Sequence, residues 1–189
     1  MQGDWGEVIL ETILDNSNLI RGLHYQTQHN IKDEQGNNLR PDVILNLPDG
    51  KRVIIDSKVS LTAYLDYTRA DNDADRASAM ARHIESIRQH IKELSRKEYH
   101  RLLDCMPDFV LMFIPIESAF LEAMRECRDD LWLEAYNRKV ILSSPTNLFA
   151  MLKLVDDLWQ RDNRNRSTER IAQLGVKLYD QFVRFVGAL

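Results

Sequence analysis

The chain has 189 residues, of which 44% are hydrophobic and 29% charged, values ordinary for one soluble globular domain. Its formal charge of −4 argues against a protein that coats nucleic acid by bulk electrostatics, so any DNA-binding basic residues must be gathered locally. Cys105 and Cys127 fit neither a disulfide framework nor a metal-ligand spacing, and no signal peptide or bilayer-length apolar stretch is visible, which predicts a cytoplasmic protein.

The first half of the chain predicts a helix followed by a β-hairpin. Residues 4–15 carry apolar side chains at helical spacing, a strand is expected around Leu23 to Ile31, and a polar turn follows at Asp33 to Asn38. Two β-branched runs then flank Pro48-Asp49-Gly50, a turn sequence in which proline fixes φ and the next residues tolerate positive φ. Both runs are apolar at consecutive positions, which predicts a hairpin buried on both faces.

The second half alternates helical and strand patterns. The expected elements are a long helix from about Asp75 to Asp104 with one apolar stripe, a buried strand at 108–115, a helix at 117–137, a strand at 140–143, a helix from Pro145 to about Gln160, a polar stretch at 161–167 and a last helix at 168–186. This alternation around a buried hairpin predicts a three-layer α/β domain.

The hairpin brings two carboxylates together. If the turn centres on Asp49-Gly50, paired positions add to about 98 and Asp42 lies opposite Asp56. Carboxylates paired in this way lie roughly 5 Å apart and repel by roughly 3 kcal/mol at an effective dielectric of about 20. A shared proton, a neighbouring cation such as Lys58, or a divalent metal could compensate. Oxygen-only ligands suit Mg²⁺ or Mn²⁺.

Such a site suits phosphodiester hydrolysis. A metal ion polarises the phosphoryl group and lowers the pKa of a bound water. Lys58 lies two residues beyond Asp56, on the same face of the strand, and could orient that water or neutralise developing charge. Glu7 and Glu11, one turn apart on the first helix, are the alternatives for completing the metal shell.

Two resemblances fit this interpretation. Pro41-Asp42, a spacer of thirteen residues and Asp56-Ser57-Lys58 resemble the signature of PD-(D/E)XK nucleases. Over nearly its whole length the chain resembles the conserved domain of the RmuC family of DNA recombination proteins. The stretches that carry this second resemblance are Gly3-Asp4-Trp5-Gly6-Glu7, Arg40-Pro41-Asp42-Val43-Ile44, Ile55-Asp56-Ser57-Lys58-Val59-Ser60-Leu61, Phe113-Ile114-Pro115-Ile116-Glu117 and Pro145-Thr146-Asn147-Leu148.

The resemblance implies a fold and a function. The fold is a restriction-endonuclease-like αβββαβ core with additional C-terminal helices, in one domain over residues 1–189. The implied function is that of a Mg²⁺- or Mn²⁺-dependent deoxyribonuclease acting in DNA recombination or repair, with Asp42, Asp56 and Glu7 (or Glu11) as metal ligands and Lys58 as the catalytic lysine. The alternative is a weak or inactive DNA-binding module that keeps the fold.

The resemblance also bears on partners and location. Members usually carry an N-terminal membrane anchor and a coiled coil, which this chain lacks, and its abrupt start at Met1-Gln2-Gly3-Asp4-Trp5 suggests a domain from a longer protein. DNA is the expected partner. No membrane contact is expected from this fragment, whereas homo-oligomerisation and anchoring of the full-length protein at the inner membrane, facing the cytoplasm, stay open.

The long helix offers a candidate DNA contact. Arg88, Lys92 and Arg96 are spaced by four and line one helix face, as a phosphate-tracking ridge would. The alternative is a solvated face with Glu–Lys pairs. Arg82 and His83 lie nearest the carboxylate end, so DNA contacts are predicted for Arg82, His83, Arg88 and Lys92.

Overall fold

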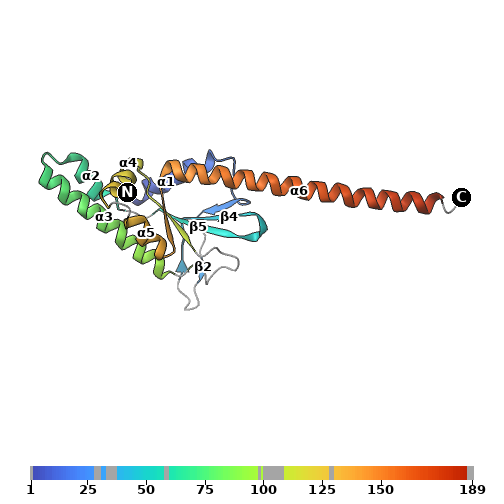
Figure 1. Ribbon diagram of the computed structural model, residues 1–189, viewed down its shortest axis with the longest axis horizontal. Helices are drawn as coiled ribbons and strands as arrows, with labels where there is room; N and C mark the ends of the chain where they lie inside the picture. The colour runs from blue at the N-terminus through green and yellow to red at the C-terminus, as the bar shows by residue number, and fades with distance from the viewer. Residues whose placement is uncertain are drawn as a thin grey trace.

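A five-stranded sheet, with strand order β1-β4-β5-β6-β7, forms the centre of the molecule. The computed structural model describes residues 2–27, 31–32, 38–57, 60–97, 99, 109–127 and 130–186, with the side chains of 2–4, 31–32, 38–39 and 178–186 left out. The elements are α1 (Gln2–Asp15), β1 (Tyr25–Thr27), β2 (Ile31–Lys32), β3 (Asn38–Leu39), β4 (Val43–Asn46), β5 (Arg52–Asp56), α2 (Thr62–Arg69), α3 (Asp73–Arg96), β6 (Val110–Phe113), α4 (Glu117–Glu126), α5 (Asp130–Asn137), β7 (Val140–Ser143) and α6 (Pro145–Val186) (Figure 1).

The predicted hairpin is confirmed, together with its register. β4 and β5 pair antiparallel from Val43↔Ile55 to Asn46↔Arg52, so paired positions add to 98. Between them lies a 3₁₀ turn over Pro48–Gly50, in which Asp49 and Gly50 have φ of 66° and 76°. These are the residue types that tolerate left-handed backbone, which explains why the turn forms at this point.

Helices cover both faces of the sheet, as the consecutive apolar runs predicted. Ile44 and Ile54 pack on one face with side chains of α3, α4 and α5, while Val43 and Ile55 pack on the other with side chains of α1 and α6. Because side chains alternate along a strand, β4 and β5 each supply both cores. β5, β6 and β7 are parallel, so the connections through α3 and through α4 and α5 cross over the sheet.

The long helix is α3, and its predicted apolar stripe is buried. Met80, Ile84, Ile87, Ile91 and Leu94 are all core residues. Asn72 caps its N-terminus by accepting a hydrogen bond from the Asp75 N–H at 2.8 Å. The described helix ends at Arg96, and most of the further residues predicted as helical, 98 and 100–104, lie outside the described residues.

The C-terminal region corrects the prediction of two helices separated by a polar stretch. α6 is one helix of 42 residues that extends far beyond the sheet (Figure 1). The stretch 161–167 contains neither glycine nor proline, and its polar side chains interact one turn apart. Arg166 pairs with Asp162 at 2.8 Å, and the Thr168 hydroxyl donates to the Arg164 carbonyl at 3.0 Å. Such i, i+4 contacts support a helix exposed to solvent.

Other boundaries also differ from the predictions. The helix expected over 117–137 is divided into α4 and α5, and α2 was not predicted. β1 covers only three residues of the strand expected over 23–31, while the turn at 33–37 lies outside the described residues. Among the described helices, none combines the length and apolarity needed to cross a bilayer.

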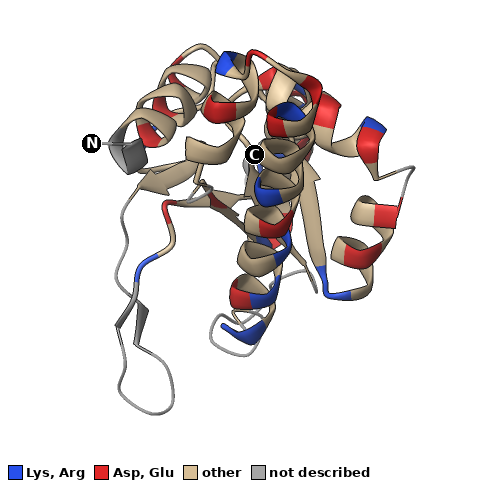
Figure 2. Cartoon of the chain, turned by 90° about the vertical axis from the view of Figure 1, so that its left-hand side faces the viewer, with Lys and Arg blue, Asp and Glu red and all other residues tan. Residues whose placement is uncertain are grey.

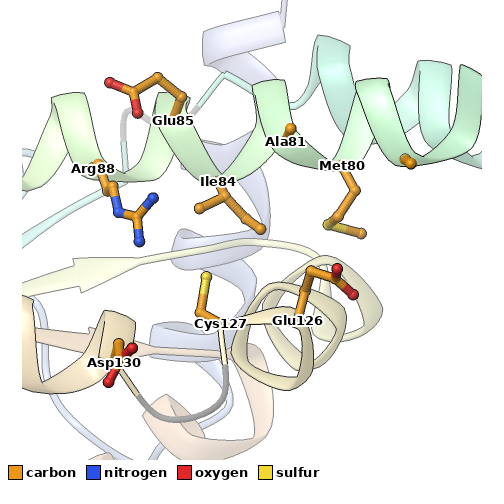
Figure 3. Close-up of a pocket in the computed structure, with 9 residues that line it drawn as sticks. Met80, Ala81, Ile84, Glu85, Arg88, Glu126, Cys127 and Asp130 are labelled. Atoms are coloured by element: carbon orange, nitrogen blue, oxygen red, sulfur yellow. The ribbon is translucent and has the colours of Figure 1, made fainter.

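The surface carries both charge signs, and Figure 2 shows acidic and basic positions interleaved over the helices. A surface pocket of about 560 Å³ lies between α3 and the α4–α5 connection (Figure 3). Met80, Ile84 and Arg88 line it on one side and Cys127 on the other. This pocket does not contain the predicted carboxylates. Cys127 is half-buried and packs against the core formed with α3, α4 and α5, while Cys105 lies outside the described residues.

Candidate active site

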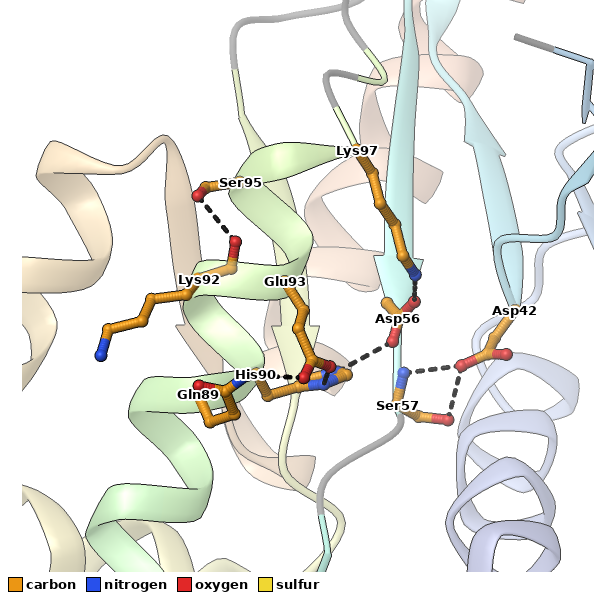
Figure 4. Close-up of polar contacts among 9 residues, drawn as sticks. All are labelled: Asp42, Asp56, Ser57, Gln89, His90, Lys92, Glu93, Ser95 and Lys97. Carbon is orange, nitrogen blue, oxygen red and sulfur yellow. Dashed lines mark hydrogen bonds and ion pairs between the residues drawn. The ribbon is translucent and has the colours of Figure 1, made fainter. Parts of the chain in front are cut away.

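Asp56 is the last residue of β5, and its carboxylate is fully buried against α3 (Figure 4). Its Oδ2 lies 3.1 Å from His90 Nε2, and its Oδ1 lies 3.4 Å from Lys97 Nζ. Since an ionised carboxylate only accepts hydrogen bonds, both basic side chains donate. Two donors offset the cost of removing this negative charge from water. His90 lies on α3 and Lys97 directly follows it, and neither was predicted as a partner of a buried carboxylate; Lys58, the cation named in the sequence analysis, lies outside the described residues.

Asp42 stands one residue before β4 and is held by the neighbouring strand. Its Oδ2 accepts hydrogen bonds from the Ser57 N–H at 2.7 Å and from the Ser57 hydroxyl at 2.9 Å (Figure 4). The side chain is 7% exposed. The hairpin register places this residue just beyond the Val43↔Ile55 pair, so Asp42 and Asp56 meet at the same end of the two strands.

Tyr99 lies within electrostatic range of both carboxylates. Burial raises the pKa of its phenol, and the negative charges of Asp56 and Asp42 raise it further. The residue is 1% exposed, and its hydroxyl has no hydrogen-bond partner among the described residues. Lys97 Nζ lies 5.6 Å from the centre of its ring. Lys97 therefore lies between the Asp56 carboxylate and the Tyr99 ring.

Helix α1 brings Glu7 rather than Glu11 to this end of the sheet. A side-chain carbon at Gly6 would lie 3.4 Å from the carbonyl oxygen of Ser57, so α1 passes close to the end of β5 at this point. Glu7 is the next residue and is half-buried. Glu11 instead forms an ion pair with Arg21, at 3.8 Å. This placement favours the first of the two predicted glutamates.

The donor set fits a hard divalent cation only in part. Within the described part of the chain, no three side chains of His, Cys, Asp or Glu are grouped so as to hold a metal ion. Mg²⁺, however, is commonly bound through one or two carboxylates and completes its shell with water and substrate phosphate. Asp42 and Asp56 provide such a pair, and the unpaired Tyr99 hydroxyl marks an unsatisfied polar position beside them. Lys58, the predicted catalytic lysine, lies outside the described residues.

The four predicted DNA contacts do not gather around Asp56. Arg82 is exposed and pairs with Asp66 at 3.0 Å, and Arg88 pairs with Glu134 at 3.0 Å beside the pocket of Figure 3. The side chain of Lys92 points away from Asp56 (Figure 4).

His83 does not fit the predicted DNA contact, because it has no exposed surface. Its Nε2 lies 3.2 Å from the Ala119 carbonyl, and burial lowers the pKa of its imidazole although that contact raises it. The helical position that looked closest to the site in the sequence faces the core in the structure.

The sequence analysis missed three residues of the site: His90, Lys97 and Tyr99. A signal existed for two of them, since His90 and Lys97 are seven residues apart and therefore share one helix face. That face also carries the buried stripe, which indicated that it turns towards the sheet. Among the histidines of this helix only His83 was given a predicted role, as a DNA contact, and no partner on the helix was predicted for a buried carboxylate. No sequence pattern pointed to Tyr99.

Comparison with known proteins gives a consistent family assignment. The sequence model of the RmuC family matches residues 1–189. The chain is 42% identical over 186 residues to the DNA recombination protein RmuC homolog of Pseudomonas aeruginosa, covering 98% of this chain and 41% of that protein. It is 42% identical over 186 residues to the DNA recombination protein RmuC of Escherichia coli, covering 98% of this chain and 39% of that protein. The chain spans less than half the length of these relatives, and it belongs to the RmuC family.

Proposed function

We propose that this domain is a Mg²⁺- or Mn²⁺-dependent deoxyribonuclease that hydrolyses phosphodiester bonds of DNA during recombination or repair. The observation that carries the proposal is the meeting of two buried carboxylates, Asp42 and Asp56, at one end of a strand pair. Relatives named for DNA recombination support DNA as the substrate class. Because the chain spans 41% or less of these two relatives, the activity, membrane anchoring and assembly of the whole protein are proposals too.

The residues take distinct roles in this proposal. Asp42 and Asp56 hold the cation, and Glu7 on α1 supports it directly or through water. When bound, the cation polarises the phosphoryl group and promotes ionisation of a water. Lys58 stabilises the negative charge that develops on the phosphate. His90 and Lys97 orient Asp56, because each contacts one of its oxygens.

The order of elements supports a place in the PD-(D/E)XK superfamily. In the main sheet, α1 precedes three antiparallel strands, β1, β4 and β5, after which α3 crosses to the parallel strand β6. This is the αβββαβ order that the resemblance implies. Asp42 and Asp56 stand at the positions where the superfamily signature places its acidic residues.

A second candidate is a DNA-binding module with little or no hydrolysis. One observation favours it: both oxygens of Asp56 contact basic side chains, which a metal ion would have to displace or share. Metal binding separates the two candidates. A protein in which Lys97 and His90 hold Asp56 permanently would show no rise in melting temperature with Mn²⁺.

The test of the proposed activity uses two lysines that flank β5. Lys58→Ala and Lys51→Ala are compared with the wild type in cleavage of labelled single-stranded, duplex and branched DNA, with Mg²⁺ or Mn²⁺. Lys51 is exposed at the hairpin turn and serves as the matched control. We expect Lys58→Ala to lose roughly 100-fold in rate and Lys51→Ala to cleave like the wild type. Equal rates in all three proteins would remove Lys58 from the mechanism.

A further inference from the structure

The Tyr99 hydroxyl is buried beside the carboxylates without a hydrogen-bond partner among the described residues. A buried polar group left in this state destabilises the folded protein. Phenylalanine would fill the same space without this cost. The hydroxyl therefore acts against stability unless a ligand of the site satisfies it.

The surroundings indicate what that ligand is. Lys97 Nζ lies 3.4 Å from Asp56 Oδ1 and 5.6 Å from the centre of the Tyr99 ring, so the ring stands in the neighbourhood of the Asp56 carboxylate. A phenol hydroxyl can donate one hydrogen bond. Its preferred partner is an oxygen, and the neighbouring carboxylates attract a cation. A water in the hydration shell of a divalent cation satisfies both, since such ions keep several waters.

We propose that Tyr99 is a positioning residue of the metal site, whose hydroxyl hydrogen-bonds a water of hydration of a divalent cation held by Asp42 and Asp56. This inference rests on the proposed metal site but does not require cleavage. Lys97 links the ring to the carboxylate, because its ammonium lies 3.4 Å from Asp56 Oδ1 and 5.6 Å from the centre of the Tyr99 ring. Neutral hydrogen-bond partners such as the Tyr99 hydroxyl orient a metal site, and their loss typically weakens metal binding about 10–100-fold.

The test measures Mn²⁺ binding by the wild type, Tyr99→Phe and Tyr136→Phe. Free Mn²⁺ is followed by electron paramagnetic resonance, and melting temperature is recorded with and without the ion. Tyr136 is 62% exposed and controls for removal of a phenolic hydroxyl elsewhere. We expect Tyr99→Phe to melt at or above the wild-type temperature without metal, while its Mn²⁺ affinity falls by roughly 10-fold or more. Tyr136→Phe should match the wild type in both.

Each other outcome is decisive. If Tyr99→Phe binds Mn²⁺ as tightly as the wild type, Tyr99 does not position the metal, even where the wild type cleaves DNA. If Tyr99→Phe binds Mn²⁺ as the wild type does but melts at a lower temperature without the ion, the hydroxyl only hydrogen-bonds a water that is independent of the metal. Weaker Mn²⁺ binding by Tyr99→Phe in a protein that never cleaves DNA would support this inference and overturn the nuclease. Absence of Mn²⁺ binding by the wild type would overturn the metal site and this role of Tyr99 together.

Discussion

The ends of β4 and β5 hold their carboxylates in different ways. Asp42, before β4, accepts hydrogen bonds from the backbone and hydroxyl of Ser57, which are neutral donors of the neighbouring strand. Asp56, at the end of β5, contacts two basic side chains of another layer, His90 and Lys97. The hairpin register thus fixes one carboxylate, whereas the docking of α3 fixes the other.

The two sets of contacts affect cation binding differently at Asp42 and at Asp56. The two contacts of Asp42 with Ser57 come from neutral donors, while Lys97 brings a positive charge to 3.4 Å from Asp56 Oδ1. A cation arriving at the pair must therefore compete with Lys97 at Asp56. It meets no such competition from Ser57 at Asp42.

The largest effect on stability is expected for His90→Ala, because it removes the more buried partner of Asp56. We expect the free energy of unfolding to fall by about 2–3 kcal/mol, typical of a lost hydrogen bond to a buried charged group. Chemical denaturation in metal-free buffer measures this. Gln89→Ala, an exposed change on the same helix, should stay within about 0.5 kcal/mol of the wild type. Equal effects of the two variants would show that α3 does not stabilise Asp56.

Lys97→Met should lower stability less than His90→Ala does, and it should raise the affinity for Mn²⁺. The Lys97 side chain is 28% exposed, so solvent weakens its ion pair with Asp56. We therefore expect the free energy of unfolding to fall by about 1–2 kcal/mol. Removing the competing ammonium should strengthen Mn²⁺ binding, which titration calorimetry measures. Lys92→Met, whose side chain points away from Asp56, is the control (Figure 4). Weaker Mn²⁺ binding by Lys97→Met alone would mean that Lys97 helps to organise the site.

Ser57→Ala tests the contact that holds Asp42. We expect this change to lower the free energy of unfolding by about 1 kcal/mol. The effect is modest because the Ser57 N–H still donates to Asp42. Thermal melting of Ser57→Ala beside Ser60→Ala, an exposed change nearby, measures it. A loss as large as that of His90→Ala would mean that the hairpin does not fix Asp42 by itself.

The smallest effect concerns pH and the buried His83 of α3. Burial lowers the pKa of His83 from its ordinary value of 6.5, so the unfolded chain binds more protons between the two pKa values. The stability that His83 contributes is full above pH 6.5 and is lost as pH falls towards its folded pKa. His83→Gln should therefore flatten the decline of melting temperature below that pH. An unchanged slope would assign the decline to other groups.

The fold was predictable where local sequence decides structure. The Pro48-Asp49-Gly50 turn determined the hairpin register, and through it the meeting of Asp42 and Asp56. The continuity of α6 was not predicted, because a polar stretch resembles a loop when its i, i+4 partners are not counted.

Only the part of the site that lies on the hairpin was predictable from the sequence. Asp42 and Asp56 follow from the hairpin, whereas His90 and Lys97 reach Asp56 through the docking of α3, across 34 and 41 residues of sequence. Helical periodicity indicates which face is buried but not which side chain it meets. His83 shows the converse error, since its closeness to the site along the sequence suggested a contact that its burial prevents.

Cleavage of labelled single-stranded, duplex and branched DNA with Mn²⁺ tests most directly whether Asp42 and Asp56 form a hydrolytic site. Wild type, Asp56→Asn and Asp66→Asn are compared, the last because Asp66 forms an exposed ion pair elsewhere. We predict cleavage by the wild type and by Asp66→Asn, with Asp56→Asn slower by about 100-fold or more, since a metal ligand contributes several kcal/mol to the transition state. Cleavage by Asp56→Asn at the wild-type rate would contradict a hydrolytic site at Asp42 and Asp56. Mn²⁺ binding by the wild type without cleavage of any substrate would contradict the nuclease.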